Sequence, residues 1–451
     1  MNIILIFKSG TRSKVENYRP ISILPSLSKI FEKIVHKRLS HHVSNVISTN
    51  QHGFVPGRSC VTNLSILMKD LLSAVNSKSQ CDIIYTDFAK AFDSINHSLL
   101  LHKLTSFGVQ GTHLKWFRSY LNDRLSRVII KNAFSEWTPI VSGVPQGSHL
   151  GPLLFNLFIN DICDNLVSNS LLFADDMKIY RIINSDYDSL TLQSDINRIV
   201  SWSDTWLLSL NPTKCKVLTV SLKRNVLTFP YKLNTHALSR VNSMRDLGVI
   251  IDQKLNFCDH VDSMIQGARK TLGFIMRNSY SINSEHVLKL LYYTMVRSKL
   301  EYASVIWNGI SKHQSDRIER VQHKFLTFLH KRTTGFYSDD INLLCNIYHL
   351  QSLKSRRAIF DNIFLYKCIN GKFNVNVLTS YFGLHVPRFL TRHAVLFHVP
   401  FGRVNCVRDS LFSRIPRQFN LLLKDHNAID PFTVSLDSFK NLLKLCYVSN
   451  C

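Results

Sequence analysis

The stretch Leu171–Tyr180, LLFADDMKIY, places two adjacent carboxylates, Asp175 and Asp176, between two short apolar runs. Two like charges about 4 Å apart repel by ~1 kcal/mol in water and by more near a protein interior, so the pair needs a physical reason. A hairpin turn is one reason, because aspartate tolerates left-handed backbone conformations. This turn has no glycine or asparagine, however, which two-residue hairpins usually prefer. A bound metal ion is the alternative reason.

The composition is that of a globular chain with a polyanionic partner. Hydrophobic residues make up 45% of the 451 residues, which is long enough for two or three domains. Lys and Arg number 55 against 31 Asp and Glu, a formal charge of +24. Such an excess is typical of proteins that bind nucleic acid. No apolar run has the ~18 residues of a membrane span, and the opening apolar run is too short for a signal peptide. We therefore expect an intracellular protein that is neither secreted nor bound to a membrane.

The ten cysteines are scattered and form no C-x-x-C pair. This spacing argues against a zinc knuckle or a redox motif and favours reduced, mostly buried thiols.

Strand-like and helix-like segments alternate in the first half of the chain. Strands are expected at 2–7 and 81–88, hairpins at 127–141 and around Asp175, and helices at 26–43, 97–108, 151–166 and 185–206. In the first of these helices, Leu27, Ile30, Ile34 and Leu39 lie roughly on one face. After residue 253 the pattern becomes helical, and after residue 331 it weakens to mixed short elements.

A second acid supports the metal interpretation of the Asp-Asp pair. Asp87 ends the apolar strand of IIYTDFAKAFDSINH, far earlier in the chain. Two strand-end acids that meet on neighbouring strands would form a cation site, and magnesium suits it because carboxylates, waters and substrate phosphates complete its octahedron. Between the two strands, VSGVPQGSHLGPLLF provides a glycine-rich loop that allows backbone to approach a ligand before a helix begins.

These segments, in this order, resemble the reverse transcriptase of non-LTR (LINE-type) retrotransposons, most closely the jockey group. The likeness covers residues 1 to about 330 and is faint beyond them. The matching stretches are KSGTRSKVENYRPISIL, QHGFVPGRS, YTDFAKAFDSINH, SGVPQGSHLGPLLFNLFINDI, FADD, WLLSLNPTKC, RDLGVIID, LEYASVIW and RIERVQHKFL.

The resemblance implies an α/β fold with an α+β palm, the right-hand polymerase fold. Fingers and palm would occupy residues 1–252, a helical thumb-like region residues 253–330, and a C-terminal region of unknown role residues 331–451. The basic face formed by Arg317, Arg320 and Lys324 would then follow a nucleic-acid backbone, although a solvated charged face is the default interpretation.

The resemblance also assigns catalytic and metal-binding roles by matching position. Asp87 and Asp175 would bind the catalytic metal, with Asp176 as their supporting neighbour. The cofactor would be two Mg²⁺ ions, with Mn²⁺ as an alternative. Lys214 resembles the lysine that protonates the leaving pyrophosphate, although a surface lysine that faces phosphate is almost as plausible.

Further positions match substrate-binding residues of the family. Lys8 and Arg19 fall on finger strands that face the triphosphate. Phe92 is similar to the bulky gate that excludes a ribose 2′-hydroxyl, although the residue type alone favours an ordinary core phenylalanine. Gln146 and Gly147 resemble the contact to the incoming nucleotide and template base. Leu247 and Gly248 look like the primer-grip turn.

Four features depart from this pattern or lie outside it. Asp93 is expected to be structural, as a cap of the following helix. Phe173 replaces the usual tyrosine, which we expect activity to tolerate. His149 stands where a smaller or apolar residue is usual and is expected to perturb the loop. The chain begins inside the first finger strand, so we expect the upstream endonuclease domain to be absent, as in a genomic fragment or a truncated gene model.

The leading hypothesis is an RNA-directed DNA polymerase that works on an RNA template, a DNA primer and deoxynucleoside triphosphates, in nuclear and/or cytoplasmic ribonucleoproteins. One alternative is a catalytically inactive nucleic-acid-binding remnant, which the missing amino-terminal part favours and the intact acids oppose. An intron-type maturase is a third hypothesis, against which the jockey-like thumb motifs speak.

Overall fold

The computed structural model describes residues 1–8, 10–386, 395–425 and 430–448. The chain forms two compact units, each built from several separate segments. The first unit comprises Met1–Pro56, Asp82–Val217 and Leu227–Arg240, and the second comprises Gly57–Cys81, Leu218–Val226 and Val241–Cys451. The division of the chain at residues 252 and 330 stays a prediction.

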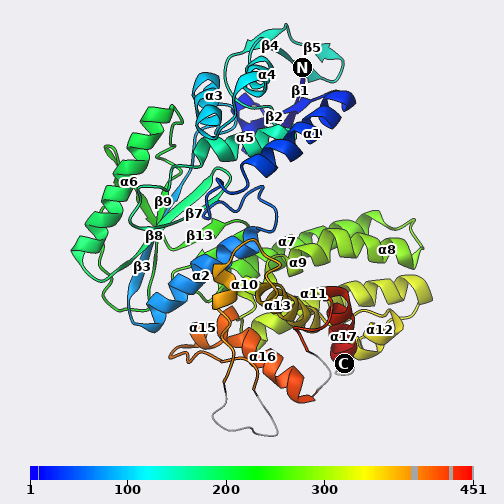
Figure 1. The fold of residues 1–451 in the computed structure, drawn as a ribbon. Coiled ribbons are helices and arrows are strands. Elements are labelled where there is room, and N and C mark those ends of the chain that lie inside the picture. The colour runs from blue at the N-terminus through cyan, green and yellow to red at the C-terminus, as the bar shows by residue number, and fades with distance from the viewer. Residues whose placement is uncertain (9, 387–394, 426–429, 449–451) are drawn as a thin grey trace. The chain divides into compact units, whose positions relative to one another are not determined.

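The first unit contains a five-stranded sheet built from β1, β2, β4, β5 and β6 (Figure 1). The order is β2-β1-β4-β5, and β6 also pairs with β4. β1 runs antiparallel to β2 and parallel to β4. The strands are β1 (Asn2–Phe7), β2 (Tyr18–Ile23), β4 (Arg124–Ile130), β5 (Ala133–Phe134) and β6 (Thr138–Ile140).

A second five-stranded sheet, which lies mainly in the first unit, has the order β12-β9-β3-β8-β7. β3 is buried along its whole length, as its apolar sequence predicts. β7 and β8 form the predicted hairpin, with Phe173 opposite Asp176. The strands are β3 (Gln80–Thr86), β7 (Asn169–Phe173), β8 (Asp176–Ile183), β9 (Lys216–Val220) and β12 (Ser239–Val241), and a small pair is formed by β10 (Lys232–Leu233) and β11 (His236–Ala237).

Helices complete the core of the first unit. They are α1 (Ser26–His42), α3 (His97–Ser106), α4 (Gly111–Leu121), α5 (Leu150–Ile159) and α6 (Asp186–Trp206), with a 3-10 turn at Val15–Asn17. Nine of the ten residues of α5 are buried, which explains its strongly apolar sequence. α6, at the position of the expected helix 185–206, begins with a capping box of Ser185 and Asp188 and packs along β8.

The predicted apolar face of α1 is largely exposed. The helix itself is confirmed, but Leu27, Ile30 and Ile34 are 80%, 59% and 57% exposed, whereas Leu39 is 6% exposed. Only the C-terminal end of the apolar stripe therefore reaches the core, next to α5.

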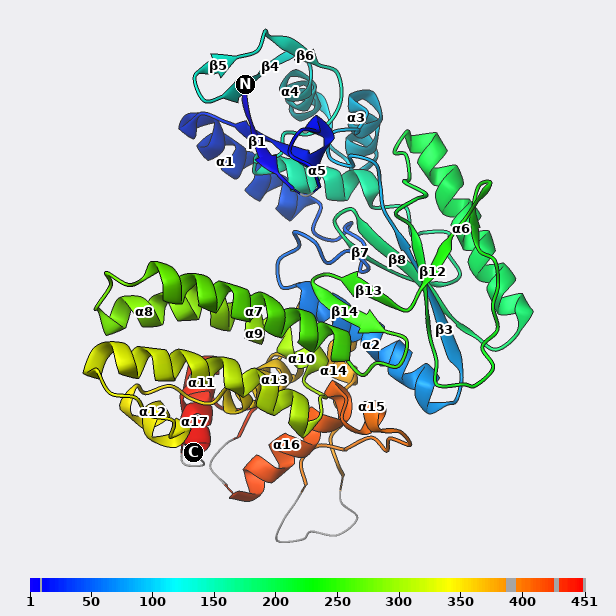
Figure 2. The same cartoon turned by 180° about the vertical axis from the view of Figure 1, so that it is seen from behind.

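The second unit is mainly helical. Figure 2 shows α7 beside α11, a packing that the contacts between them bear out. α11 buries an apolar stripe that consists of Ile318, Val321, Phe325 and Leu329. The elements are α2 (Cys60–Asn76), β13 (Ser243–Asp246), β14 (Val249–Asp252), α7 (Cys258–Asn278), α8 (Glu285–Leu291), a π-helical segment (Tyr292–Arg297), α9 (Ser298–Glu301), α10 (Ser304–Trp307) and α11 (Lys312–Thr334).

The expectation of mixed short elements after residue 331 is wrong, because the described residues of this region include the long helices α13, α16 and α17. The elements are α12 (Ile341–Ile347), α13 (Leu353–Ile369), α14 (Val377–Ser380), α15 (Asn405–Arg408), α16 (Leu411–Asp425) and α17 (Leu436–Val448). In α13 both polar and apolar side chains are buried, among them Arg357, Asp361 and Asn362, so the helix lacks a clean apolar period.

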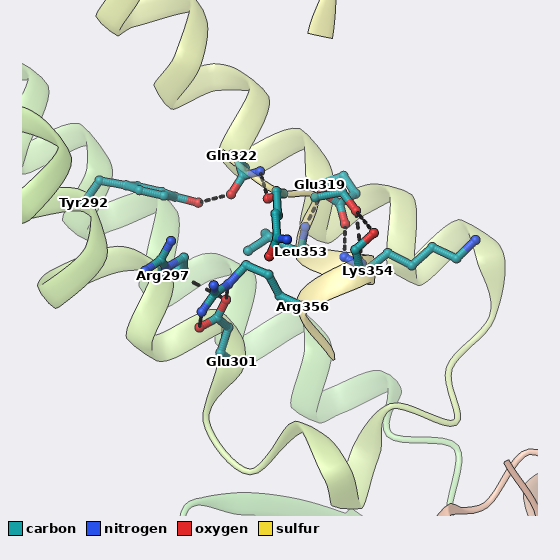
Figure 3. Close-up of polar contacts among 11 residues, drawn as sticks. Tyr292, Arg297, Glu301, Glu319, Gln322, Leu353, Lys354 and Arg356 are labelled. Atoms are coloured by element: carbon teal, nitrogen blue, oxygen red, sulfur yellow. Dashed lines mark hydrogen bonds and ion pairs between the residues drawn. The ribbon is translucent and has the colours of Figure 1, made fainter. Parts of the chain in front are cut away.

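Polar contacts join this region to the preceding helices within the second unit (Figure 3). Arg356 of α13 forms an ion pair with Glu301 of α9, with Nη2 donating to Oε2 at 3.0 Å. The carboxylate of Glu319 in α11 accepts hydrogen bonds from the backbone N–H groups of Leu353 and Lys354 at the start of α13. The segment after residue 331 is therefore built into the same unit as α9 and α11.

Two sequence expectations concern the whole chain. In the part of the chain that the structure describes, nine cysteines are present and none is in a disulfide; Cys451 lies outside the described residues. Among the same residues, no helix combines the length and the hydropathy that a membrane crossing would require.

Candidate active site

Asp87 and Asp175 belong to one electrostatic cluster in the first unit. Asp87 follows the end of β3, and Asp175 lies in the two-residue turn between β7 and β8. Burial raises the pKa of Asp175 above its ordinary value of 3.8, and the negative charge of Asp87 raises it further, whereas its own backbone N–H group lowers it. The two strand-end acids therefore interact, as the sequence predicts.

Lys8 and Arg19 contribute positive charge to the same place, since both lower the pKa of Asp175. Arg19 lies on β2 opposite Ile6 of β1, and Lys8 directly follows β1, where its backbone N–H group donates to the carbonyl of Asn17 at 2.8 Å. Both side chains are exposed. They are therefore accessible to an anionic ligand near the two carboxylates.

Lys214 contacts Asp87 directly. Its Nζ lies 3.2 Å from Oδ2 of Asp87, with side chains that are 58% and 38% exposed. The loop that carries Lys214 is held against the same acid, because the N–H group of Asn211 donates to the carbonyl of Asp87 at 2.7 Å and the N–H group of Asp87 donates to Sγ of Cys215 at 3.4 Å. The motif WLLSLNPTKC thus lies at the end of β3.

Asp176 is exposed and opens β8. Within the residues described, no three His, Cys, Asp or Glu side chains form a group that could hold a metal ion. Carboxylate oxygens nevertheless fit a hard cation such as Mg²⁺, which needs only one or two carboxylates when waters and substrate phosphates supply its other ligands. The paired Asp87 and Asp175 meet this requirement.

The turn itself has an unusual residue in it. Ala174 has a φ of 55°, a left-handed conformation that costs a non-glycine residue ~1–2 kcal/mol. A hairpin turn is therefore present although it lacks glycine and asparagine. Residues outside the hairpin stabilise its left-handed backbone. Gln51 and Gly53 provide that support, and no functional role had been predicted for either.

The glycine-rich loop packs between β2 and the turn after β3. The N–H group of Ser22 in β2 donates to the carbonyl of Gln146 at 2.8 Å. Gly147 has a φ of 106°, and a Cβ there would lie 2.9 Å from the Ser22 carbonyl oxygen. Only glycine fits this close approach.

Gln146 and Asp93 are hydrogen-bonded to each other, with Nε2 of Gln146 donating to Oδ1 of Asp93 at 2.8 Å. Burial raises the pKa of Asp93, although this hydrogen bond and the charge of Lys90 oppose the effect. The prediction that Asp93 caps the following helix is wrong, because Asn96 is the N-cap residue of α3 and accepts from Leu99 N–H at 3.1 Å. Asp93 instead orients the amide of Gln146.

Phe92 is half-buried, and its ring stacks on that of Phe155 in α5, with centroids 4.4 Å apart and an interplanar angle of 18°. One face of the Phe92 ring thus packs in the core. The part of the ring that stays accessible is compatible with the predicted role of excluding a ribose 2′-hydroxyl. The side chain of His149 is exposed, and its backbone N–H group donates to Oε2 of Glu32 at 2.9 Å. The expectation that His149 perturbs the loop stays a prediction.

Leu247 and Gly248 lie in the second unit, in the two-residue turn between β13 and β14. Their φ angles of 44° and 89° are those of a tight hairpin turn in which both residues are left-handed. The hydroxyl of Tyr302 donates to the carbonyl of Leu247 at 2.9 Å. The predicted primer-grip turn is thus fastened to the end of α9.

The first unit has the sheet, the paired acids and the glycine-rich loop of a nucleotide polymerase palm. Residues 6–251, more than half of the chain, match the family model described as reverse transcriptase (RNA-dependent DNA polymerase), and the chain belongs to this family. The right-hand polymerase fold class is confirmed, and the family implies use of a divalent metal ion.

Curated relatives are similar to the chain over most of its length. It is 29% identical over 337 residues to a probable RNA-directed DNA polymerase from transposon BS of Drosophila melanogaster, covering 71% of the chain and 37% of the relative. It is 28% identical over 345 residues to the RNA-directed DNA polymerase from mobile element jockey of the same species, covering 72% and 37%. The resemblance to jockey-type elements is confirmed, and the chain spans just over a third of the length of these relatives.

A solved structure, apo telomerase from Candida tropicalis truncated from its C-terminal domain, is 13% identical to the chain with a TM-score of 0.39, and covers 56% of this chain and 53% of its own.

Proposed function

We propose that the chain is the RNA-directed DNA polymerase of a non-LTR retrotransposon and adds deoxynucleotides to a primer 3′-hydroxyl. The observation that carries the proposal is the electrostatic cluster of Asp87 and Asp175 with Lys8 and Arg19, to which Lys214 is joined through Asp87. The two acids would bind the metal ions, and the exposed cations beside them would bind the triphosphate.

Asp87 and Asp175 would hold two Mg²⁺ ions, or Mn²⁺ in their place, with Asp176 as the adjacent supporting acid. Two such ions, when bound, activate an attacking hydroxyl and stabilise the leaving oxygen of an in-line phosphoryl transfer. The role of the chain itself is to fix these carboxylates at the ends of two strands of one sheet.

The remaining residues would bind and orient the nucleotide. Lys8 and Arg19 attract the triphosphate and stabilise charge that develops on its oxygens. Phe92 excludes a 2′-hydroxyl. Gln146, oriented by Asp93, and Gly147 contact the incoming nucleotide and template base.

The reaction forms one bond and breaks another. The primer 3′-hydroxyl gives its proton to solvent water and its oxygen bonds to the α-phosphorus, while the bond from that phosphorus to the bridging oxygen of pyrophosphate breaks. Lys214 would donate a proton to the leaving pyrophosphate, because its Nζ lies beside Asp87, where the metal-bound triphosphate would bind.

The second unit would bind the RNA template and DNA primer. Arg320 and Lys324 of α11 are exposed, whereas Arg317 is paired with Asp262 at 2.7 Å. The two exposed cations are the better candidates for phosphate contacts. Leu247 and Gly248 would support the primer end. We propose that the protein acts inside a ribonucleoprotein in the nucleus and/or cytoplasm.

A primer-extension assay tests the polymerase function. The purified chain is given a DNA primer on an RNA template, deoxynucleoside triphosphates and Mg²⁺, in parallel with Asp175→Ala and with Asp204→Ala, whose exposed carboxylate lies on α6. We expect extension by wild type and Asp204→Ala and none by Asp175→Ala. Extension by wild type no better than by Asp175→Ala would overturn the proposal.

A further inference from the structure

A buried segment runs beside the strand that leads into the Asp175 turn. Residues 50–52 lie parallel to β7: the N–H group of His52 donates to the carbonyl of Leu172 at 2.8 Å, and the N–H group of Leu172 donates to the carbonyl of Asn50 at 2.9 Å. Gln51, between these two contacts, is 1% exposed. Its polar side chain therefore has to satisfy its hydrogen bonds inside the protein.

The side chain of Gln51 is bonded to the turn. Its Oε1 accepts from the N–H groups of Gly53 and Ala174, both at 2.8 Å, and its Nε2 lies 3.4 Å from the carbonyl oxygen of Ala174. Two backbone donors converge on one atom, so that atom must be the amide oxygen. Gln51 thus contacts both the N–H and the C=O group of the residue before Asp175.

Gly53 closes the turn from the other side. A Cβ at Gly53 would lie 2.3 Å from the backbone nitrogen of Ala174 and 2.9 Å from the carbonyl carbon of Phe173, so the two backbones are in direct contact. The carbonyl of Gly53 accepts from Nδ2 of the buried Asn156 in α5 at 2.7 Å. The segment is therefore bound to the core helix α5 as well as to the turn.

We propose that Gln51 is a positioning residue for catalysis, which holds Ala174 in its left-handed conformation and thereby aims the carboxylate of Asp175 toward Asp87. The left-handed conformation strains the backbone at Ala174, and the hydrogen bonds to Gln51 stabilise Ala174 in this conformation. The proposal rests on the polymerase function for its catalytic part. Its structural part, that Gln51 orders the turn, stands independently.

Three variants separate positioning from simple stability. Gln51→Met keeps the length of the side chain but removes its hydrogen bonds, and Gln51→Glu keeps an acceptor for both N–H groups. Asn160→Met is the matched control, because Asn160 also links backbone groups of this segment, accepting from Ser48 N–H at 2.8 Å and donating to the Val46 carbonyl at 2.9 Å, but does not touch the turn.

Three measurements are made on each: kcat and KM for the nucleotide, the Mg²⁺ concentration for half-maximal rate, and hydrogen exchange of the peptide that spans the β7–β8 turn. We expect Gln51→Met to lower kcat roughly 10- to 100-fold with KM little changed, as for a displaced catalytic group. It should also raise the Mg²⁺ requirement and speed exchange at the turn. Gln51→Glu should restore most of kcat, and Asn160→Met should leave the turn and the Mg²⁺ requirement unchanged.

The inference would be overturned if Gln51→Met had the kcat of wild type and the same rate of hydrogen exchange at the turn. It would also be overturned if Asn160→Met changed exchange at the turn as much as Gln51→Met does. If Gln51→Met does not fold, Gln51→Asn replaces it, since the shorter amide cannot reach both donors. A wild-type chain that is as inert as Asp175→Ala refutes the polymerase function instead, and hydrogen exchange at the turn then decides the role of Gln51 alone.

Discussion

Nζ of Lys214 lies 3.2 Å from Oδ2 of Asp87, so a lysine from the loop before β9 neutralises the acid at the end of β3. This contact links two of the motifs that the sequence separates widely. It also places a proton donor beside a carboxylate that we propose to bind metal.

Lys214→Met should lower kcat for primer extension by about 10²-fold, because general acid catalysis contributes at least that much. RNA binding should be unchanged. The control is Lys216→Met, since Lys216 is two residues away but contacts the Thr213 carbonyl and Ser239 instead of Asp87. Equal losses in the two variants would contradict a specific role for Lys214.

Asp175→Asn should abolish extension yet raise the unfolding temperature at pH 7 when divalent ions are absent. The folded chain binds a proton at Asp175 more tightly than the unfolded chain does, because burial and Asp87 raise its pKa. Asp175 therefore loses stabilising free energy as the pH rises from 3.8 through its folded pKa, and the advantage of asparagine should vanish at and below pH 3.8.

Asp188→Asn is the opposite case and serves as the comparison in the same melts. Burial raises the pKa of Asp188, but hydrogen bonds from Asn184, Ser185 and Arg181 outweigh burial and lower it. Its stabilising effect is present above pH 3.8 and is lost as the pH falls through the folded pKa, so Asp188→Asn should lower the unfolding temperature at pH 7. Two melts that shift in the same direction would refute the electrostatic explanation.

Phe92→Val should increase incorporation of ribonucleotides relative to deoxynucleotides, because a smaller side chain leaves room for the 2′-hydroxyl. The ratio of the two kcat/KM values measures this effect. Phe155→Leu, which removes the stacked ring in α5, should cost stability but leave the ratio unchanged. An unaltered ratio in Phe92→Val would identify Phe92 as a core residue only.

Tyr302→Phe should raise KM for the primer–template several-fold, with a free-energy change of about 1 kcal/mol, the usual value of one hydrogen bond. The variant loses the bond to the Leu247 carbonyl and the hydrogen bond between the Tyr302 hydroxyl and the side chain of Cys60. Gly248→Ala should have a larger effect, because φ is 89° and a Cβ would lie 2.9 Å from the Tyr302 ring. A KM for primer–template that is unchanged in both variants would remove the turn from primer binding.

Arg414→Met should destabilise the second unit by ~3–5 kcal/mol, the usual cost of removing one partner of a buried ion pair. Nε and Nη2 of Arg414 in α16 donate to the carboxylate of Asp361 in α13 at 3.0 and 3.1 Å, and both side chains are buried. Replacing both partners, with Arg414→Met and Asp361→Leu, should recover much of the loss in urea unfolding. A double variant no more stable than the single one would argue against this interpretation.

The sequence predicts local structure where one physical rule dominates. β1, β3 and α5 follow their apolar patterns, and α6 begins at its capping box. The predicted proximity of Asp87 and Asp175 follows from a general property, that acids at strand ends meet at a sheet edge, and from the family resemblance.

Other features depend on partners distant in sequence and could not be predicted. The stripe of Leu27, Ile30 and Ile34 looks like a core face, but no described element buries it. α13 buries Arg357 and Asp361, whose partners lie in other helices. Because these charged residues interrupt the apolar pattern, the sequence does not indicate that α13 is a core helix. The support of the active-site turn by Gln51 left only a weak signal, a polar pair before Gly53 in the stretch QHGFVPGRS.

The segmented second unit has a consequence for biosynthesis. Nε of Arg58 donates to the carbonyl of Asn374, and the side chain of Asn76 accepts from the N–H group of Arg403, so both ends of α2 are tied to residues made more than 300 positions later. On the ribosome, α2 emerges long before these partners are synthesised. Its apolar side therefore stays exposed to solvent while most of the chain is translated. This interval is the period in which a chaperone would have the best opportunity to engage the nascent protein.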